Sequence, residues 1–191
     1  MRSVLLVWPL IIGLFVVPVT LAAASPLLAW RDPVYIASGF AGIAALSLLL
    51  LQPLLAAGLL PGLSMRRARQ IHRFLGFTLV LTVILHVVGL WITSPPDVID
   101  ALLFSSPTPF SDWGVVAMWT LFLVAAIALF RRKLRLSPKT WRRVHMALAV
   151  VVIIGSAVHA LRVEGTMELF SKVALCLSVS LSAAWAVFRL N

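Results

Sequence analysis

The chain has 191 residues, of which 62% are hydrophobic and 12% charged, and its mean hydropathy is +1.07. Soluble domains are about 45–50% apolar and about 25% charged, so this composition excludes a water-soluble globular protein, a disordered chain and a disulfide-stapled module. The formal charge of +10 would suit a nucleic-acid-binding protein, but the basic residues lie between long apolar runs, which is typical of membrane topology.

Six apolar segments follow one another, each of about the length that crosses a bilayer as a helix. They cover residues 4–24, 35–60, 71–92, 114–130, 144–161 and 169–188. Only helices and closed barrels satisfy their backbone groups in lipid, and the alternation of a barrel strand is absent. We therefore predict an all-α fold, a six-helix transmembrane bundle, with residues 1–191 forming a single integral membrane domain.

Two segments need separate comment. The first resembles a signal peptide loosely, because Arg2 and an apolar run precede three alanines, but the run is long for a signal peptide and contains Pro9 and Pro18. We expect it to be retained as a membrane span. The connection 93–112 is rich in proline and serine, and its apolar middle, residues 98–104, is expected to lie on the membrane surface as a short helix.

The basic residues cluster on one side of this six-span arrangement. That side holds Arg2, Arg66, Arg67, Arg69, Arg73, Arg131, Arg132, Lys133, Arg135, Lys139, Arg142, Arg143 and Arg189. An excess of lysine and arginine marks the cytoplasmic side of a membrane protein. We therefore predict that the N and C termini are both cytoplasmic, and we expect the membrane to be the bacterial inner membrane.

Four histidines form a second pattern, and all of them lie in apolar segments. His72 and His86 are fourteen residues apart in the third segment, and His145 and His159 are fourteen apart in the fifth. Fourteen residues make just under four helical turns, so both histidines of a segment share one face and stand about 21 Å apart along the axis. The two segments run in the same direction, so we expect His72 level with His145, and His86 level with His159.

Such pairs suit haem better than zinc. Zinc usually takes four ligands, often with cysteine or carboxylate help, and neither residue type lies at the depth of the pairs. A haem iron needs only two axial ligands from the protein, and imidazole is a common one. We predict two bis-histidine b-type haems, or one if a single pair is loaded. His72 and His145 would bind the inner iron, and His86 and His159 the outer iron.

Two glycines are candidate contacts of the haem plane. Gly76 lies one turn after His72, and Gly155 lies one turn before His159. Residues one turn apart share a helix face, so a missing side chain there leaves room for a flat ring.

Two arginines and two hydroxyl groups complete the predicted surroundings. Arg73 and Arg142 adjoin the inner pair, where their charge suits the haem propionates. The hydroxyl groups of Thr82 and Ser156 are candidate partners for the imidazole nitrogens that do not bind iron. The sequence indicates no catalytic residue.

With these residues in view, the core of the chain, residues 35–162, resembles the ferric reductase-like transmembrane domain family. The likeness rests on the two histidine pairs and on the runs at residues 67–76 (RARQIHRFLG) and 141–145 (WRRVH). The family includes ferric reductases, NADPH oxidases and the haem-binding membrane subunit of a bacterial methionine sulfoxide reductase. That bacterial subunit has no counterpart of His72, so the four histidines are more similar to the two-haem members.

The resemblance implies electron transfer across the membrane through the haems, from a cytoplasmic flavoprotein or membrane quinol to an acceptor at the outer surface. The acceptor would be ferric iron, oxygen or a periplasmic protein. In the oxidases and ferric reductases, a cytoplasmic domain with FAD and NADPH supplies the inner haem. No such domain follows the sixth segment here, so we expect an oxidoreductase subunit that needs a separate electron donor.

Three alternatives remain open from the sequence. A proton or metal-ion transporter could use the histidines as relays, although such relays usually include acidic residues inside the spans. A cytochrome b561-like quinol oxidoreductase also uses paired histidines, with different helix pairings. The third alternative is a scaffold that keeps the fold without a cofactor.

Overall fold

The structure is a computed structural model that describes residues 2–165 and 167–190, and these residues form helices and connections without a strand. The elements are α1 (Arg2–Ala23), the 3-10 helix η1 (Pro26–Leu28), α2 (Pro33–Ala56), α3 (Met65–Thr93), α4 (Pro95–Leu102), α5 (Pro109–Phe130), α6 (Pro138–Arg162) and α7 (Leu169–Leu190). Six of them are long and apolar enough to cross a membrane, which confirms the predicted all-α bundle of six candidate spans.

Several helices begin earlier than the apolar segments that predicted them, because polar capping residues determine their starts. The Ser64 hydroxyl accepts a hydrogen bond from the backbone N–H of Arg67, so α3 begins at Met65 rather than at residue 71. The Ser137 hydroxyl likewise accepts from the N–H of Thr140, so α6 begins at Pro138 rather than at residue 144. Hydropathy marks the apolar stretch, and these two helices begin in the polar residues that precede it.

The end of α2 and the surface helix also differ from their predicted ranges. α2 ends at Ala56 rather than at residue 60, and Gly58 follows with φ of +64°, a conformation that L side chains rarely adopt. The expected surface helix forms as α4, three residues earlier than predicted. It buries Val98 and leaves Ile99 exposed, and its position on the membrane surface stays a prediction.

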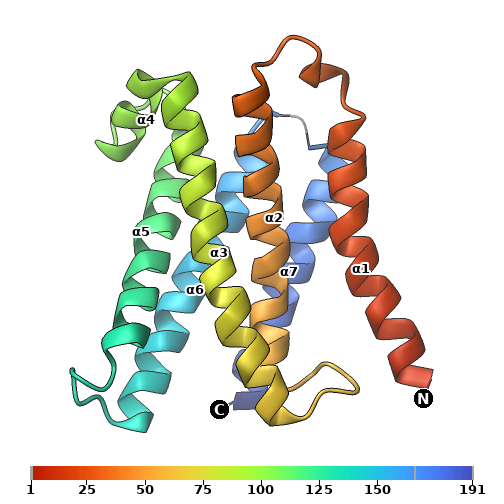
Figure 1. Cartoon of the computed structure of the whole chain (residues 1–191), viewed down its shortest axis with the longest axis vertical. Helices are drawn as coiled ribbons and strands as arrows, with labels where there is room; N and C mark the ends of the chain where they lie inside the picture. The colour runs from red at the N-terminus through yellow and green to blue at the C-terminus, as the bar shows by residue number, and fades with distance from the viewer. Residues whose placement is uncertain (1, 166, 191) are drawn as a thin grey trace.

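The bundle is built from two tightly packed helix pairs. α2 packs along α3, and α5 packs along α6, while α7 fits against both α2 and α6 (Figure 1). α1 lies at the edge of the bundle against α2 and α7. The indole N–H of Trp8 on α1 donates to the carbonyl of Pro61, which fastens α1 to the connection between α2 and α3.

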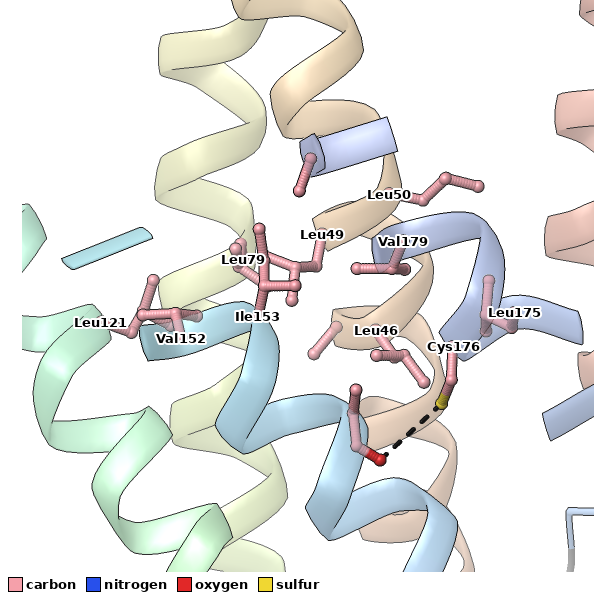
Figure 2. Packing of buried hydrophobic residues seen from close by; sticks show 13 residues of the cluster. Leu46, Leu49, Leu50, Leu79, Leu121, Val152, Ile153, Leu175, Cys176 and Val179 are labelled. Carbon is pink, nitrogen blue, oxygen red and sulfur yellow. Dashed lines mark hydrogen bonds between the residues drawn. The ribbon is translucent and has the colours of Figure 1, made fainter. Parts of the chain in front are cut away.

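The core lies where the two helix pairs meet α7. Leu49 of α2, Leu79 of α3, Ile153 of α6 and Val179 of α7 converge there (Figure 2). The single cysteine, Cys176, is buried in the same cluster, and its thiol points to the carbonyl of Ala157. This core joins α3 and α6 through side chains and fixes their relative height.

The two ends of the bundle differ in charge. The chain termini lie at the same end as the α2–α3 and α5–α6 connections (Figure 1). We call this the basic end, because its exposed side chains include Arg66, Arg67, Arg69, Arg73, Arg131, Arg132, Lys133, Arg135, Lys139, Arg142 and Arg143. All six acidic residues of the sequence, Asp32, Asp97, Asp100, Asp112, Glu164 and Glu168, lie in or beside the connections at the other end, which we call the acidic end.

Candidate functional site

The structure brings the four histidines together as two facing pairs, one toward each end of the bundle. The ring centres of His72 on α3 and His145 on α6 are 6.1 Å apart, with an angle of 75° between the ring planes. The ring centres of His86 and His159 are 6.4 Å apart, with an angle of 77°. Both helices start near the basic end, so the first pair lies toward that end. We call it the inner pair and the second the outer pair, after the predicted orientation.

In the outer pair, each ring is anchored by a main-chain carbonyl of the neighbouring helix. Nδ1 of His86 donates to the carbonyl oxygen of Ser38 on α2, at 2.8 Å. Nδ1 of His159 donates to the carbonyl oxygen of Phe110 on α5, also at 2.8 Å. A carbonyl oxygen can only accept, so Nδ1 carries the proton and Nε2 presents a lone pair. That tautomer is the one a metal ion needs at Nε2.

A glycine allows each of these close approaches. Gly42 lies four residues after Ser38, and Gly114 lies four residues after Phe110, so in each case the glycine is one turn along the same helix face. A Cβ atom on Gly42 would lie 3.1 Å from Nδ1 of His86, and one on Gly114 would lie 2.7 Å from Nδ1 of His159. Sequence reasoning missed both glycines, because their contacts are with a histidine on another helix.

The inner pair is held differently. Nδ1 of His72 donates to the carbonyl oxygen of Gln52 at 3.2 Å. Nδ1 of His145 is buried and has no hydrogen-bond partner. The ring of His145 instead packs against the ring of Trp141, with 4.9 Å between the ring centres.

The spacing and chemistry of both pairs fit a haem iron. A metal–imidazole bond is about 2.0–2.1 Å long, so one iron between two imidazole nitrogens separates the ring centres by about 6 Å. Both observed separations match this value. In the described residues, no group of three or more histidine, cysteine, aspartate or glutamate side chains is placed to hold a metal ion. Two imidazoles per site therefore suit a metal whose other ligands come from a macrocycle.

The two glycines predicted to contact the haem planes have different surroundings. A Cβ on Gly76 would meet only the Gln52 side chain, at 3.8 Å, so space remains beside His72. Gly155 faces α5, where a Cβ would lie 3.0 Å from both Cβ of Ala117 and the carbonyl oxygen of Trp113. The glycine at this position lets α5 and α6 approach closely.

The arginines and hydroxyl groups predicted near the histidines make no hydrogen bond to a histidine ring in the described residues. Arg73 and Arg142 are exposed at the basic end, beside the inner pair in sequence. The expectation that Thr82 contacts a ring nitrogen is wrong, because its hydroxyl donates to the carbonyls of Thr78 and Leu79 in its own helix. Within the described residues, no hydrogen bond joins Ser156 to a histidine ring. The three ring nitrogens that have partners use main-chain carbonyls, which sequence patterns do not reveal.

Comparison with known proteins points to the same core. The family model described as "Ferric reductase like transmembrane component" matches residues 39–156, more than half of the chain. The matched stretch contains three of the four paired histidines and ends three residues before His159. No curated protein and no solved structure matches the chain.

Proposed function

Because the chain belongs to the ferric reductase-like transmembrane family, we propose that it carries electrons across the membrane through two b-type haems, one at each histidine pair. The observation that carries this proposal is the presence of two imidazole pairs between α3 and α6, each with its ring centres about 6 Å apart. The family match supports transmembrane electron transfer in general. The assignment of one haem to each pair is our own.

Haem bound at each pair would supply a one-electron redox centre, and the reaction chemistry would belong to that cofactor. The chain's own residues determine ligation and access. His72 with His145, and His86 with His159, would hold the two haem irons, and an iron held by two imidazoles would favour electron transfer over the binding of oxygen. The carbonyls of Gln52, Ser38 and Phe110 would keep three of the four rings oriented with Nε2 free.

The charge separation favours one orientation. Lysine and arginine accumulate on the cytoplasmic side of membrane proteins, so we place the basic end in the cytoplasm and the acidic end outside, in a bacterial inner membrane. The inner pair is then nearest the cytoplasm, where a donor would deliver electrons. The outer pair is nearest the acceptor, for which ferric iron, oxygen and a periplasmic protein are the candidates.

The basic end favours a protein as the electron donor. It presents a broad positive surface, and none of the described acidic residues lies there. Such a surface steers and orients a partner with an acidic face, such as a reduced flavoprotein.

A quinol donor has less support from the structure. An apolar groove of about 500 Å³ lies between α6 and α7, and its lining includes Val150, Ile154, Ser180 and Phe188. Oxidation of a quinol releases protons, and the residues that line this groove include neither a carboxylate nor an imidazole to accept them.

Spectroscopy of the purified protein tests the proposal. We expect the alpha band of reduced b-type haem and two haems per chain. His86→Ala or His159→Ala should leave one haem, the inner one, and His72→Ala or His145→Ala should remove the inner haem. Phe77→Ala alters an exposed side chain of α3, the helix of His72 and His86. It is the matched control and should keep two haems. Absence of haem from the native protein, or two haems in all four histidine variants, would contradict the proposal.

A further inference from the structure

The four histidines differ in what fixes the orientation of their rings. His72, His86 and His159 each donate through Nδ1 to a main-chain carbonyl of a neighbouring helix. His145 has no such partner, although its Nδ1 is buried. A hydrogen bond at the second ring nitrogen normally holds a metal-ligating imidazole in one rotation. His145 therefore needs another means of holding its ring.

The structure provides that means in Trp141. This residue lies four positions before His145 on α6, on the same helix face. The two ring centres are 4.9 Å apart, and the planes are tilted by 35°, so the indole covers the imidazole. The guanidinium of Arg131 also lies over the Trp141 ring, 5.8 Å from its centre. Trp141 and His145 thus form a stack, and Arg131 packs against the same indole.

From this stack we propose that Trp141 is the positioning residue of the inner site. Its ring plane sets the rotation of the His145 imidazole, as hydrogen bonds do for the other three histidines. This inference rests on the proposed function only in taking His145 to be an iron ligand. It makes the inner site unequal to the outer site, since one inner ligand is oriented by packing alone.

The angle between the two imidazole planes gives this role a spectroscopic signature. Each axial imidazole interacts with the iron d orbitals in one plane, so nearly perpendicular rings keep two of these orbitals close in energy. Low-spin ferric haem then gives a highly anisotropic electron paramagnetic resonance signal, whereas parallel rings give a rhombic one. The angles of 75° and 77° predict the highly anisotropic signal for both sites.

The first experiment compares these signals in variants of the full chain. In Trp141→Leu we expect the highly anisotropic signal of the inner site, about half of the low-spin intensity, to shift. The signal of the outer site should stay unchanged. Trp141→Phe keeps an aromatic plane and should retain both signals. Trp119→Leu, which alters an exposed tryptophan that packs on Phe122, is the matched control. Two unchanged signals in Trp141→Leu would overturn the proposal. The outer signal reports that the variant is folded, and Trp141→Met replaces Trp141→Leu if leucine prevents folding.

The second experiment needs no haem and separates failure of this inference from failure of the proposed function. The indole ring current shifts nuclear magnetic resonance signals of nearby protons. In haem-free protein with labelled histidines, Trp141→Leu should move the ring signals of His145 and leave those of His86 and His159 in place. An unchanged His145 spectrum would overturn the positioning role even if the native protein binds two haems. If the His145 signals shift but the native protein never binds haem, the positioning role of Trp141 stands and the proposed function is rejected.

Discussion

A single methyl group added at Gly114 would lie 2.7 Å from Nδ1 and 2.9 Å from Cε1 of His159. The ring would have to leave the carbonyl of Phe110, which fixes its rotation and its proton. At Gly42 the same addition would lie 3.1 Å from Nδ1 of His86, a distance that a small shift of the ring can relieve. The outer site therefore requires glycine at position 114 more strictly than at position 42.

We expect Gly114→Ala to lose the outer haem, so that haem per chain falls from two to about one. Gly42→Ala should keep both sites with weaker outer binding, within the roughly 10- to 100-fold range typical of lost supporting contacts. Gly39→Ala is the control, because a Cβ there would meet nothing within 4 Å. The haem content of purified protein measures all three. Full haem content in Gly114→Ala would show that the Phe110 contact is dispensable.

At the scale of single elements, the start of α7 depends on one carboxylate in the α6–α7 connection. The Glu168 carboxylate accepts hydrogen bonds from the backbone N–H groups of Phe170, at 2.7 Å, and Ser171, at 2.9 Å. These bonds hold the pKa of Glu168 below its ordinary value of 4.5. One turn later, the ammonium of Lys172 donates to the carbonyl of Val163, which follows α6. The Glu168 carboxylate thus caps α7, and the Lys172 contact fixes α7 against the end of the helix that carries His145 and His159.

The lowered pKa predicts a pH dependence of stability. Because the folded chain binds the proton of Glu168 more weakly than the unfolded chain, the stabilisation is complete above pH 4.5 and is lost as the pH falls through the folded-state value. We expect Glu168→Gln to unfold at a lower temperature than the native protein at pH 7, and this difference to shrink below pH 4.5. Thermal unfolding in detergent measures it, with Glu164→Gln as the control from the same connection. A difference that stays constant down to pH 3 would refute the capping role.

For the whole molecule, the main feature is the separation of charge between the basic end and the acidic end. It favours one orientation in the membrane, and Cys176 makes that orientation easy to test. The thiol of Cys176 is only 2% exposed, so the native chain should not react with a maleimide that cannot cross membranes. New cysteines can therefore be introduced without removing the native one.

We expect Ser105→Cys, in the connection at the acidic end, to react with this reagent in intact cells. Lys133→Cys, at the basic end, should react only in inside-out vesicles or after lysis. The unaltered chain is the control for labelling of Cys176. The reverse pattern would place the basic end outside and would exclude a cytoplasmic donor at that end.

The sequence by itself was enough to predict the all-α bundle, because hydropathy over about 20 residues is a local property that the bilayer imposes on each helix. It also placed the four histidines at two depths, because equal spacing on parallel helices determines height along the axis. Helix starts were less accurate, since caps such as Ser64 and Ser137 lie outside the apolar stretches.

Only the tertiary structure decided what surrounds each imidazole. The partners of the rings are carbonyls of Gln52, Ser38 and Phe110, and every residue type carries a carbonyl. The glycines that admit the outer rings lie on α2 and α5, about 45 residues away in sequence. Such contacts depend on the distance between helices, which local patterns do not contain. The missing partner of His145 becomes visible only in the packed bundle, whereas the indole that covers its ring lies one turn away on α6 itself.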